Sequence, residues 1–259
     1  MKVIWVLACL AACASAPSKF EVGPVTGRAV VGARTFECAR AGLFETTGGT
    51  RRWLGDPGLR PFALAGGAAG LLVGGGSPAV RGEVRLCDLD GQVLASAHIA
   101  EDLVYGVALD PRGKLAAAAC ADGSVQLLAT PQLTESRVVW RHGAPALAVA
   151  FSPEGELLAS AGLDGVIVVG DAAASLAPQR LVDHTAGVLC LAWSPDGQLL
   201  ASGARDGKVR LHARSGRLLR TWPRLGGEVI GVGFVGREVA VRLAGLPGRS
   251  VSAEVTLLH

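Results

Sequence analysis

Short apolar segments separated by tight turns run through most of this sequence. Between residues 184 and 222, the first turn carries Pro195 at its second position, where the proline ring fixes the backbone angle φ. The second turn contains Asp206-Gly207, a pair typical of β-hairpins. Strict alternation of apolar and polar residues over 208–212 indicates a half-buried strand. Four short strands in one antiparallel sheet are therefore predicted, at residues 188–193, 199–203, 208–212 and 218–222.

The turn residues recur with a constant period. The turns at 110–113, 152–155 and 194–197 each lie 42 residues apart, and the Asp-Gly pairs beginning at Asp122 and Asp164 precede Asp206 by the same step. A fixed period of this length is the signature of repeated supersecondary units. Four-stranded antiparallel units that repeat in this way predict an all-β fold, a β-propeller with one blade per unit.

The pattern expected for the third strand of each unit occurs six times. Since the chain stops just after the sixth occurrence, the last unit lacks a fourth strand, and we expect residues 18–22 to fill that place. Pairing of the two ends would close the ring and leave no open sheet edge. We predict six four-stranded blades closed by an N-terminal strand; five blades plus an irregular N-terminal segment is the alternative. The six occurrences are residues 42–44, 84–87, 125–127, 166–168, 209–211 and 255–257.

Two neighbouring units share a polar set with identical spacing. In each, a Ser follows a His by 18 residues and an Asp follows it by 22. A catalytic His–Asp dyad is one interpretation, but repetition in successive units favours a structural role, in which each His bonds to a buried Asp. The two sets are His142, Ser160 and Asp164, and His184, Ser202 and Asp206.

These features together resemble the WD-repeat (WD40) family. The resemblance rests on residues 151–160 and 193–211, which read Phe-Ser-Pro then Leu-Leu-Ala-Ser, and Trp through Asp-Gly-Lys-Val-Arg-Leu. In that family a Trp of the third strand completes the His–Ser–Asp set, whereas Gly170 and His212 stand at the matching positions here. The family resemblance implies a non-catalytic platform that binds proteins, with no cofactor. We expect a monomeric ring, and each polar set must be completed in another way.

The first residues read as an export signal. The apolar run of residues 3–12 is too short to span a bilayer as a helix. Residues 10–13, Leu-Ala-Ala-Cys, resemble the bacterial lipobox, which implies lipidation of Cys13. Ordinary cleavage near residues 14–16 is the alternative, which Pro17 disfavours. We therefore divide the chain into a signal and lipobox region, 1–16, and one propeller domain, 17–259.

That division implies a location for the protein. We expect an exported lipoprotein anchored in the membrane of the cell envelope, the outer membrane if the cell is Gram-negative. A soluble secreted or periplasmic protein is the alternative. A scaffold at the envelope that presents its loops to a partner protein is the function this predicts.

Charge and residue composition argue against several other classes of function. A formal net charge of +3 gives no strong attraction to nucleic acid, which we do not expect as a partner. The predicted inner strands are apolar, which disfavours a propeller enzyme with a site in the central channel. Such an enzyme, or a small-molecule sensor with a site in the channel, is the alternative function. The cysteines at 38, 87, 120 and 190 lie in apolar runs without a C-x-x-C pair, so we expect buried free thiols rather than a metal site.

Two further groups are candidates for partner contacts. The last two units carry an excess of basic residues, which forms a possible basic partner face; a solvated strand surface is the alternative. Trp53, Trp140 and Trp222 fall in or near predicted fourth strands, where we expect them to pack between blades rather than to anchor a partner. The possible basic face comprises Arg205, Lys208, Arg210, Arg214, Arg217 and Arg220.

Overall fold

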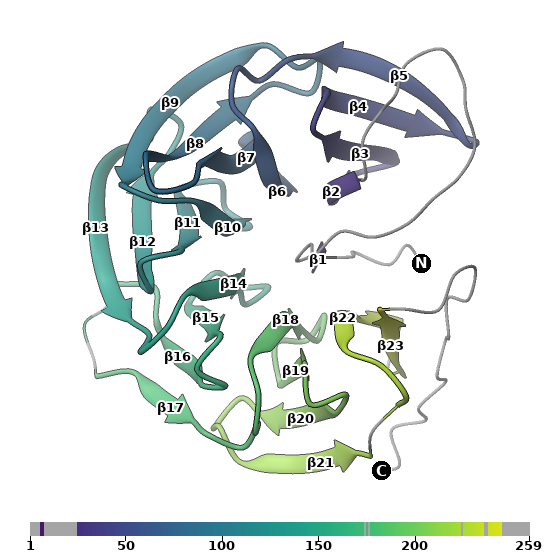
Figure 1. Cartoon of the computed structure of the whole chain (residues 1–259), viewed down its shortest axis with the longest axis vertical. Helices are drawn as coiled ribbons and strands as arrows, with labels where there is room; N and C mark the ends of the chain where they lie inside the picture. The colour runs from purple at the N-terminus through teal and green to yellow at the C-terminus, as the bar shows by residue number, and fades with distance from the viewer. Residues whose placement is uncertain are drawn as a thin grey trace.

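The fold is a ring of β-sheets around one axis (Figure 1). The computed structural model describes residues 6–7, 25–173, 175, 177–223, 225–235 and 238–244. Within these ranges every regular element is a strand, and the strands form six sheets, five of them with four antiparallel strands. No helix in this part of the chain could cross a membrane. The predicted six-bladed propeller is thereby confirmed.

Each blade runs outward in chain order, from an inner strand at the axis to an outer strand at the rim (Figure 1). Blade one contains β2 (Val25–Val31), β3 (Arg34–Ala39), β4 (Gly42–Thr47) and β5 (Thr50–Gly55). Blade two contains β6 (Pro61–Gly67), β7 (Gly70–Ser77), β8 (Arg81–Cys87) and β9 (Val93–Ala100). Blade three contains β10 (Val104–Leu109), β11 (Leu115–Cys120), β12 (Ser124–Ala129) and β13 (Thr134–Arg141).

The second half of the ring follows the same order. Blade four contains β14 (Ala146–Phe151), β15 (Leu157–Gly162), β16 (Ile167–Asp171) and β17 (Gln179–Leu181). Blade five contains β18 (Val188–Trp193), β19 (Leu199–Ala204), β20 (Val209–Ala213) and β21 (Leu218–Trp222). Blade six contains β22 (Val229–Val235) and β23 (Glu238–Leu243), with β1 (Val6–Leu7) paired to β22.

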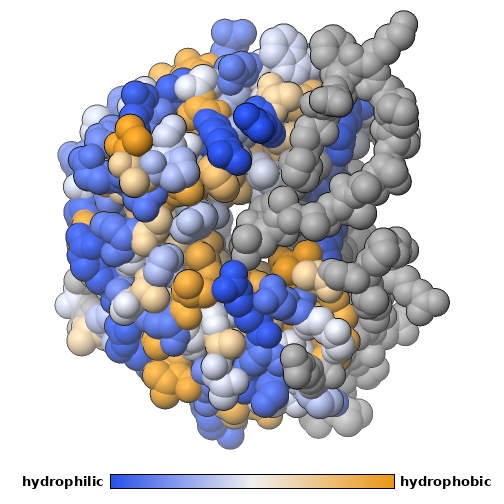
Figure 2. All heavy atoms as spheres, viewed as in Figure 1, coloured by the Kyte–Doolittle hydropathy of each residue, from blue (hydrophilic) through white to orange (hydrophobic). Residues whose placement is uncertain are grey.

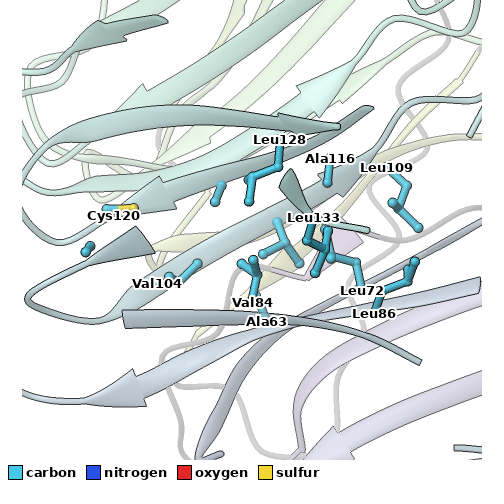
Figure 3. Close-up of a cluster of buried hydrophobic side chains, with 13 residues drawn as sticks. Ala63, Leu72, Val84, Leu86, Val104, Leu109, Ala116, Cys120, Leu128 and Leu133 are labelled. Atoms are coloured by element: carbon cyan, nitrogen blue, oxygen red, sulfur yellow. The ribbon is translucent and has the colours of Figure 1, made fainter. Parts of the chain in front are cut away.

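The core lies between blades rather than inside one sheet. Figure 3 shows the cluster between blades two and three, where Leu72 and Leu86 face Leu109 and Ala116. Residues 116–119 of β11 are all alanine and fully buried, so neighbouring sheets approach closely across small side chains. Burial of a leucine such as Leu72 contributes about 2 kcal/mol to the free energy of folding. Each blade is therefore stable only against its neighbours, as expected for a repeat architecture.

A β-bulge at the same place in all six inner strands shows that the blades are equivalent, including those whose sequence repeat is weak. A bulge inserts one extra residue and strengthens the local twist. The aromatic rings of two neighbouring bulge residues, Phe62 and Tyr105, meet edge to face with their centroids 6.2 Å apart. The extra residues are Thr26, Phe62, Tyr105, Leu147, Leu189 and Ile230.

The short strand β1 pairs with blade six. Val6 and Leu7 pair with Val232 and Gly231 on the inner edge of β22, near the axis (Figure 1). An N-terminal segment thus does pair with blade six, but at its inner edge. The prediction placed residues 18–22 at the outer edge of that blade. That segment and the third strand predicted at 255–257 both lie outside the described residues. Closure by residues 18–22 thus stays a prediction.

Candidate functional site

The polar set of blade four ties the loop between β13 and β14 to the turn between β15 and β16. His142 Nε2 lies 2.8 Å from Ser160 Oγ, and His142 Nδ1 lies 3.3 Å from Asp164 Oδ1. The other Asp164 oxygen accepts the backbone N–H of Gly143 at 2.9 Å. One carboxylate therefore satisfies a ring nitrogen and a loop amide at once, which fixes the conformation of this loop.

An indole from the preceding blade completes this set. Trp140 lies on β13, the outer strand of blade three, and its Nε1–H donates to Ser160 Oγ at 2.7 Å. A Cβ added to Gly170 would lie 2.9 Å from the Trp140 ring, so only glycine leaves room for the indole. Trp140 thus occupies the space that a third-strand Trp of blade four would fill. Because Ser160 accepts from the indole, its own proton is free to go to His142 Nε2, and His142 Nδ1–H then donates to Asp164.

Blade five completes its set with an arginine. His184 Nε2 lies 2.8 Å from Ser202 Oγ and His184 Nδ1 lies 3.1 Å from Asp206 Oδ2, as in blade four. Here, however, Arg210 NH1 lies 2.5 Å from His184 Nδ1 and donates to Asp206 Oδ2 at 2.9 Å. A guanidinium can only donate hydrogen bonds. His184 Nδ1 therefore accepts from Arg210, and its proton sits on Nε2, the tautomer opposite to that of His142.

A second histidine lies beside this network. His212 stands at the third-strand position of the family's Trp, is fully buried, and its Nε2 bonds to Asp183 Oδ2 at 2.9 Å. Asp183 belongs to the loop between β17 and β18. His212 and His184 thus hold one loop at two consecutive residues.

Burial keeps these histidines neutral. It lowers the pKa of His142 and of His212 below the usual range, with Asp164 and Asp183 acting against it. Burial and the charge of Arg210 lower the pKa of His184 to about 4. For Asp206, burial acts to raise the pKa, but hydrogen bonds from Arg210 and the Lys208 amide outweigh it and bring the pKa to about 2. Blade five therefore holds an anionic Asp206 and a cationic Arg210 around a neutral ring.

The hydrogen-bonded sequence Ser–His–Asp matches that of hydrolase triads, but the serine hydroxyls are inaccessible to a substrate. Ser160 and Ser202 are fully buried, and their hydroxyls are engaged by His142 and His184. A nucleophile must reach a bound substrate, which these cannot. Among the described residues, no group of three His, Cys, Asp or Glu side chains is placed to hold a metal ion. The geometry of these sets supports loop fixation.

The six basic residues do not share one face, and the structure corrects the inclusion of Arg210. Its side chain is only 6% exposed, and it pairs with Asp206 inside blade five. Arg205 and Lys208 flank the β19–β20 turn. Arg214 and Arg217 lie at the opposite end of the blade, and Arg214 pairs with Glu154 and Glu156. Arg220 lies over the ring of Trp222 at 4.9 Å.

The tryptophans and cysteines divide between the core and the surface. Trp140 and Trp222 are buried between blades as predicted, whereas packing was the wrong prediction for Trp53, whose side chain is 61% exposed. The four cysteines within the described residues are buried free thiols, as predicted. Burial raises the pKa of Cys87 to about 11 and that of Cys120 to about 12. Cys13 lies outside the described residues.

Two exposed aliphatic side chains stand on the loops that the polar sets fix. Val182, in the β17–β18 loop, is 72% exposed, and Leu163, in the β15–β16 turn, is 37% exposed. Both loops emerge at the same end of the ring, because β15 and β17 run in the same direction within blade four. Figure 2 shows that hydrophilic residues cover much of the ring around scattered hydrophobic ones. Sequence reasoning missed this pair, since an isolated aliphatic residue beside a turn carries no distinctive pattern.

Comparison with protein families supports the repeat interpretation. The model described as WD domain, G-beta repeat matches residues 90–127, 135–171 and 177–212. Each matched segment begins in the outer strand of one blade and continues through the first three strands of the next. Trp140 and Ser160 therefore belong to one repeat although they lie in different blades. No curated protein matches the chain. The three matched repeats, within a ring of six similar sheets, support placing this chain in a WD-repeat family.

Proposed function

We propose that this chain is a non-catalytic scaffold that binds a partner protein at the bacterial cell envelope. WD40 repeats generally mediate protein–protein interaction, which supports the binding role. One observation carries the proposal. In two repeats the buried polar sets hold the connecting loops in place, and those loops carry the exposed aliphatic side chains of Leu163 and Val182.

The binding surface proposed is the loop end of blades four and five, defined by Leu163 and Val182. Loops fixed before binding lose little conformational entropy on association, which favours affinity. Arg141 and Arg180 flank this surface, and Arg180 reaches the Arg141 carbonyl at 3.4 Å. Aliphatic residues beside arginines suit a mixed interface with an apolar centre and a polar rim.

A photo-crosslinking experiment tests this surface. A photoreactive amino acid replaces Val182 in cells, and crosslinked species are identified by mass spectrometry. The matched control carries the same residue at Val138, which is 45% exposed on the rim strand β13. We expect a discrete crosslinked partner from position 182 and none, or only a diffuse background, from position 138. Equal crosslinking at both positions, or none at 182, contradicts the proposed surface.

The envelope location rests on the leader sequence. Residues 10–13 resemble the lipobox, so Cys13 would become the lipid-modified first residue of the mature protein, and β1 would be removed with the leader. Growth with a clickable fatty acid should label the wild-type protein, and Cys13→Ser should abolish the label. An unlabelled wild-type protein would leave plain secretion as the route of export.

A further inference from the structure

Blade one carries an excess of positive charge. Residues 25–55 contain five arginines and two glutamates, an excess of +3. Arg28 and Arg51 pair with the buried carboxylate of Glu37, and Arg34 and Arg52 pair with Glu45. Asp90, in the β8–β9 turn of blade two, also pairs with Arg34 and Arg52, so three carboxylates face the five arginines of this blade.

Trp53 stands at the exposed edge of the same blade. It lies on β5, the outer strand at the rim, opposite Phe44 of β4 (Figure 1). A Cβ added to Gly42 would lie 2.9 Å from the Trp53 indole nitrogen. The ring therefore lies against the start of β4, beside the β3–β4 turn that carries exposed Arg40. An exposed aromatic side chain and an exposed arginine thus lie near the same turn of the blade.

Arginines flank this ring along the strand. The side chains of Arg51 and Arg52 keep 39% and 59% of their surface exposed despite their ion pairs. In the register of their sheets, Val138 of β13 and Thr221 of β21 occupy the position of Trp53. Neither of those outer strands therefore combines an exposed Trp with two adjacent arginines. We call Arg40, Arg51, Arg52 and Trp53 the blade-one edge.

We propose that the blade-one edge binds the surface of an anionic lipid bilayer. Tryptophan favours the headgroup region because its ring is apolar and its N–H needs a polar partner. Basic side chains near an anionic leaflet each contribute about 1 kcal/mol of attraction. The combination of an exposed indole with exposed Arg40 and two half-exposed, ion-paired arginines fits that partner better than an apolar peptide.

The position of the edge in the chain suits this role. The inference rests on the proposed lipid anchor at Cys13, which precedes Val25 at the start of blade one by 12 residues. Fully extended, such a tether spans at most about 40 Å. The tether joins the ring at blade one, so this blade lies within its reach of the bilayer, and a basic patch beside an acyl anchor is a second signal that strengthens attachment.

Vesicle binding of the unlipidated full-length chain tests the edge independently of the anchor. The protein carries Cys13→Ser, and binding is measured by cosedimentation with vesicles of phosphatidylglycerol and phosphatidylcholine or of phosphatidylcholine alone. Attraction by the leader is common to all variants. We expect tighter binding to the anionic vesicles, and Arg40→Gln should weaken that binding about fivefold, the equivalent of one basic residue.

The depth of the indole provides a second measurement. Brominated phosphatidylglycerol should quench part of the tryptophan emission, and Trp53→Phe should reduce that quenching relative to the parent protein, because Trp140 and Trp222 are buried, Trp193 is partly buried, and any quenching of Trp5 in the leader is common to all variants. The matched controls are Leu94→Ala on the rim of blade two and Arg217→Gln on blade five, both exposed. These controls should bind vesicles like the parent protein.

Several results would overturn the inference. Equal loss of binding in Arg217→Gln and Arg40→Gln would show a general charge effect, and quenching unchanged by Trp53→Phe would place the indole outside the headgroups. If Trp53→Ala weakens partner crosslinking while vesicle binding is unchanged, the edge binds a protein instead. Failure here leaves the fatty-acid label at Cys13 and the crosslink at Val182 unaffected, so the proposed function is tested separately.

Discussion

Two tryptophans in equivalent places should respond differently to the same substitution. Trp140 and Trp222 lie opposite Val125 and Val209 at the same register of their outer strands, and both are buried. The indole N–H of Trp140 donates to Ser160, whereas that of Trp222 is buried and has no hydrogen-bond partner among the described residues. The reason lies in the next blade, where Val241 of β23 occupies the position equivalent to Ser160.

The expected magnitudes follow from this difference. Replacement of either Trp by Phe loses similar apolar contact in the seam between blades. Trp140→Phe also loses a hydrogen bond, about 1 kcal/mol, whereas Trp222→Phe removes an unsatisfied buried donor that costs about 1–3 kcal/mol. Weaker contact between Arg220 and a phenyl ring offsets part of that gain, by about 0.5 kcal/mol. Trp140→Phe should therefore destabilise the protein by about 2 kcal/mol more than Trp222→Phe.

Urea unfolding monitored by far-ultraviolet circular dichroism measures the free energy of unfolding without relying on the substituted fluorophore. The dependence on urea should be unchanged in both variants, so that midpoints report stability alone. Losses equal within about 0.5 kcal/mol, or a greater loss for Trp222→Phe, would refute the assignment of Trp140 as the partner of Ser160.

The remaining predictions concern protonation and access. Because the pKa of His184 falls from 6.5 to about 4 on folding, the unfolded chain binds the extra proton between these values; stability should be full above pH 6.5 and fall by up to about 3 kcal/mol as the pH drops toward 4. Urea midpoints at pH 7 and pH 5 should then differ less in His184→Gln, and an unchanged difference would contradict the shift. Nitrogen-15 NMR should find the proton of His142 on Nδ1 and that of His184 on Nε2; identical tautomers would exclude the proposed role of Arg210. Iodoacetamide should leave Cys87 and Cys120 unmodified in the native protein at pH 8 and alkylate both in urea, as judged by mass.

Regular spacing made the architecture predictable from the sequence. Turn residues 42 apart fix where each sheet begins, and the constant His-to-Asp separation places His142 and Asp164 at adjoining loops. Blade one was harder, because its turns lack the Pro and Asp signals, yet β2 to β5 pair like the other blades. Packing against blade two stabilises these strands, although their turn residues do not predict them.

Contacts across a seam between blades were not predictable. Gly170 indicated that a Trp was missing, but the sequence does not show that Trp140 enters the same space from the neighbouring sheet. A Trp two residues before His142 was the available signal. Arg210 was misassigned to the surface because alternation along β20 predicts which residues share a face, not whether an adjacent blade covers that face. Trp53 is exposed because it occupies the register position of Val138 and Thr221, which are exposed in their own blades.

The offset between repeats and blades has a consequence for how the ring could be divided. A break at residues 130–133, between β12 and β13, separates two matched repeats but leaves their fragments sharing one sheet. The backbone hydrogen bonds between β12 and β13 would then hold the halves together. A break between β13 and β14 would instead leave no sheet divided at the cut. Fragments cut at the former point should reassemble more readily, since an unpaired strand edge recruits its missing neighbour.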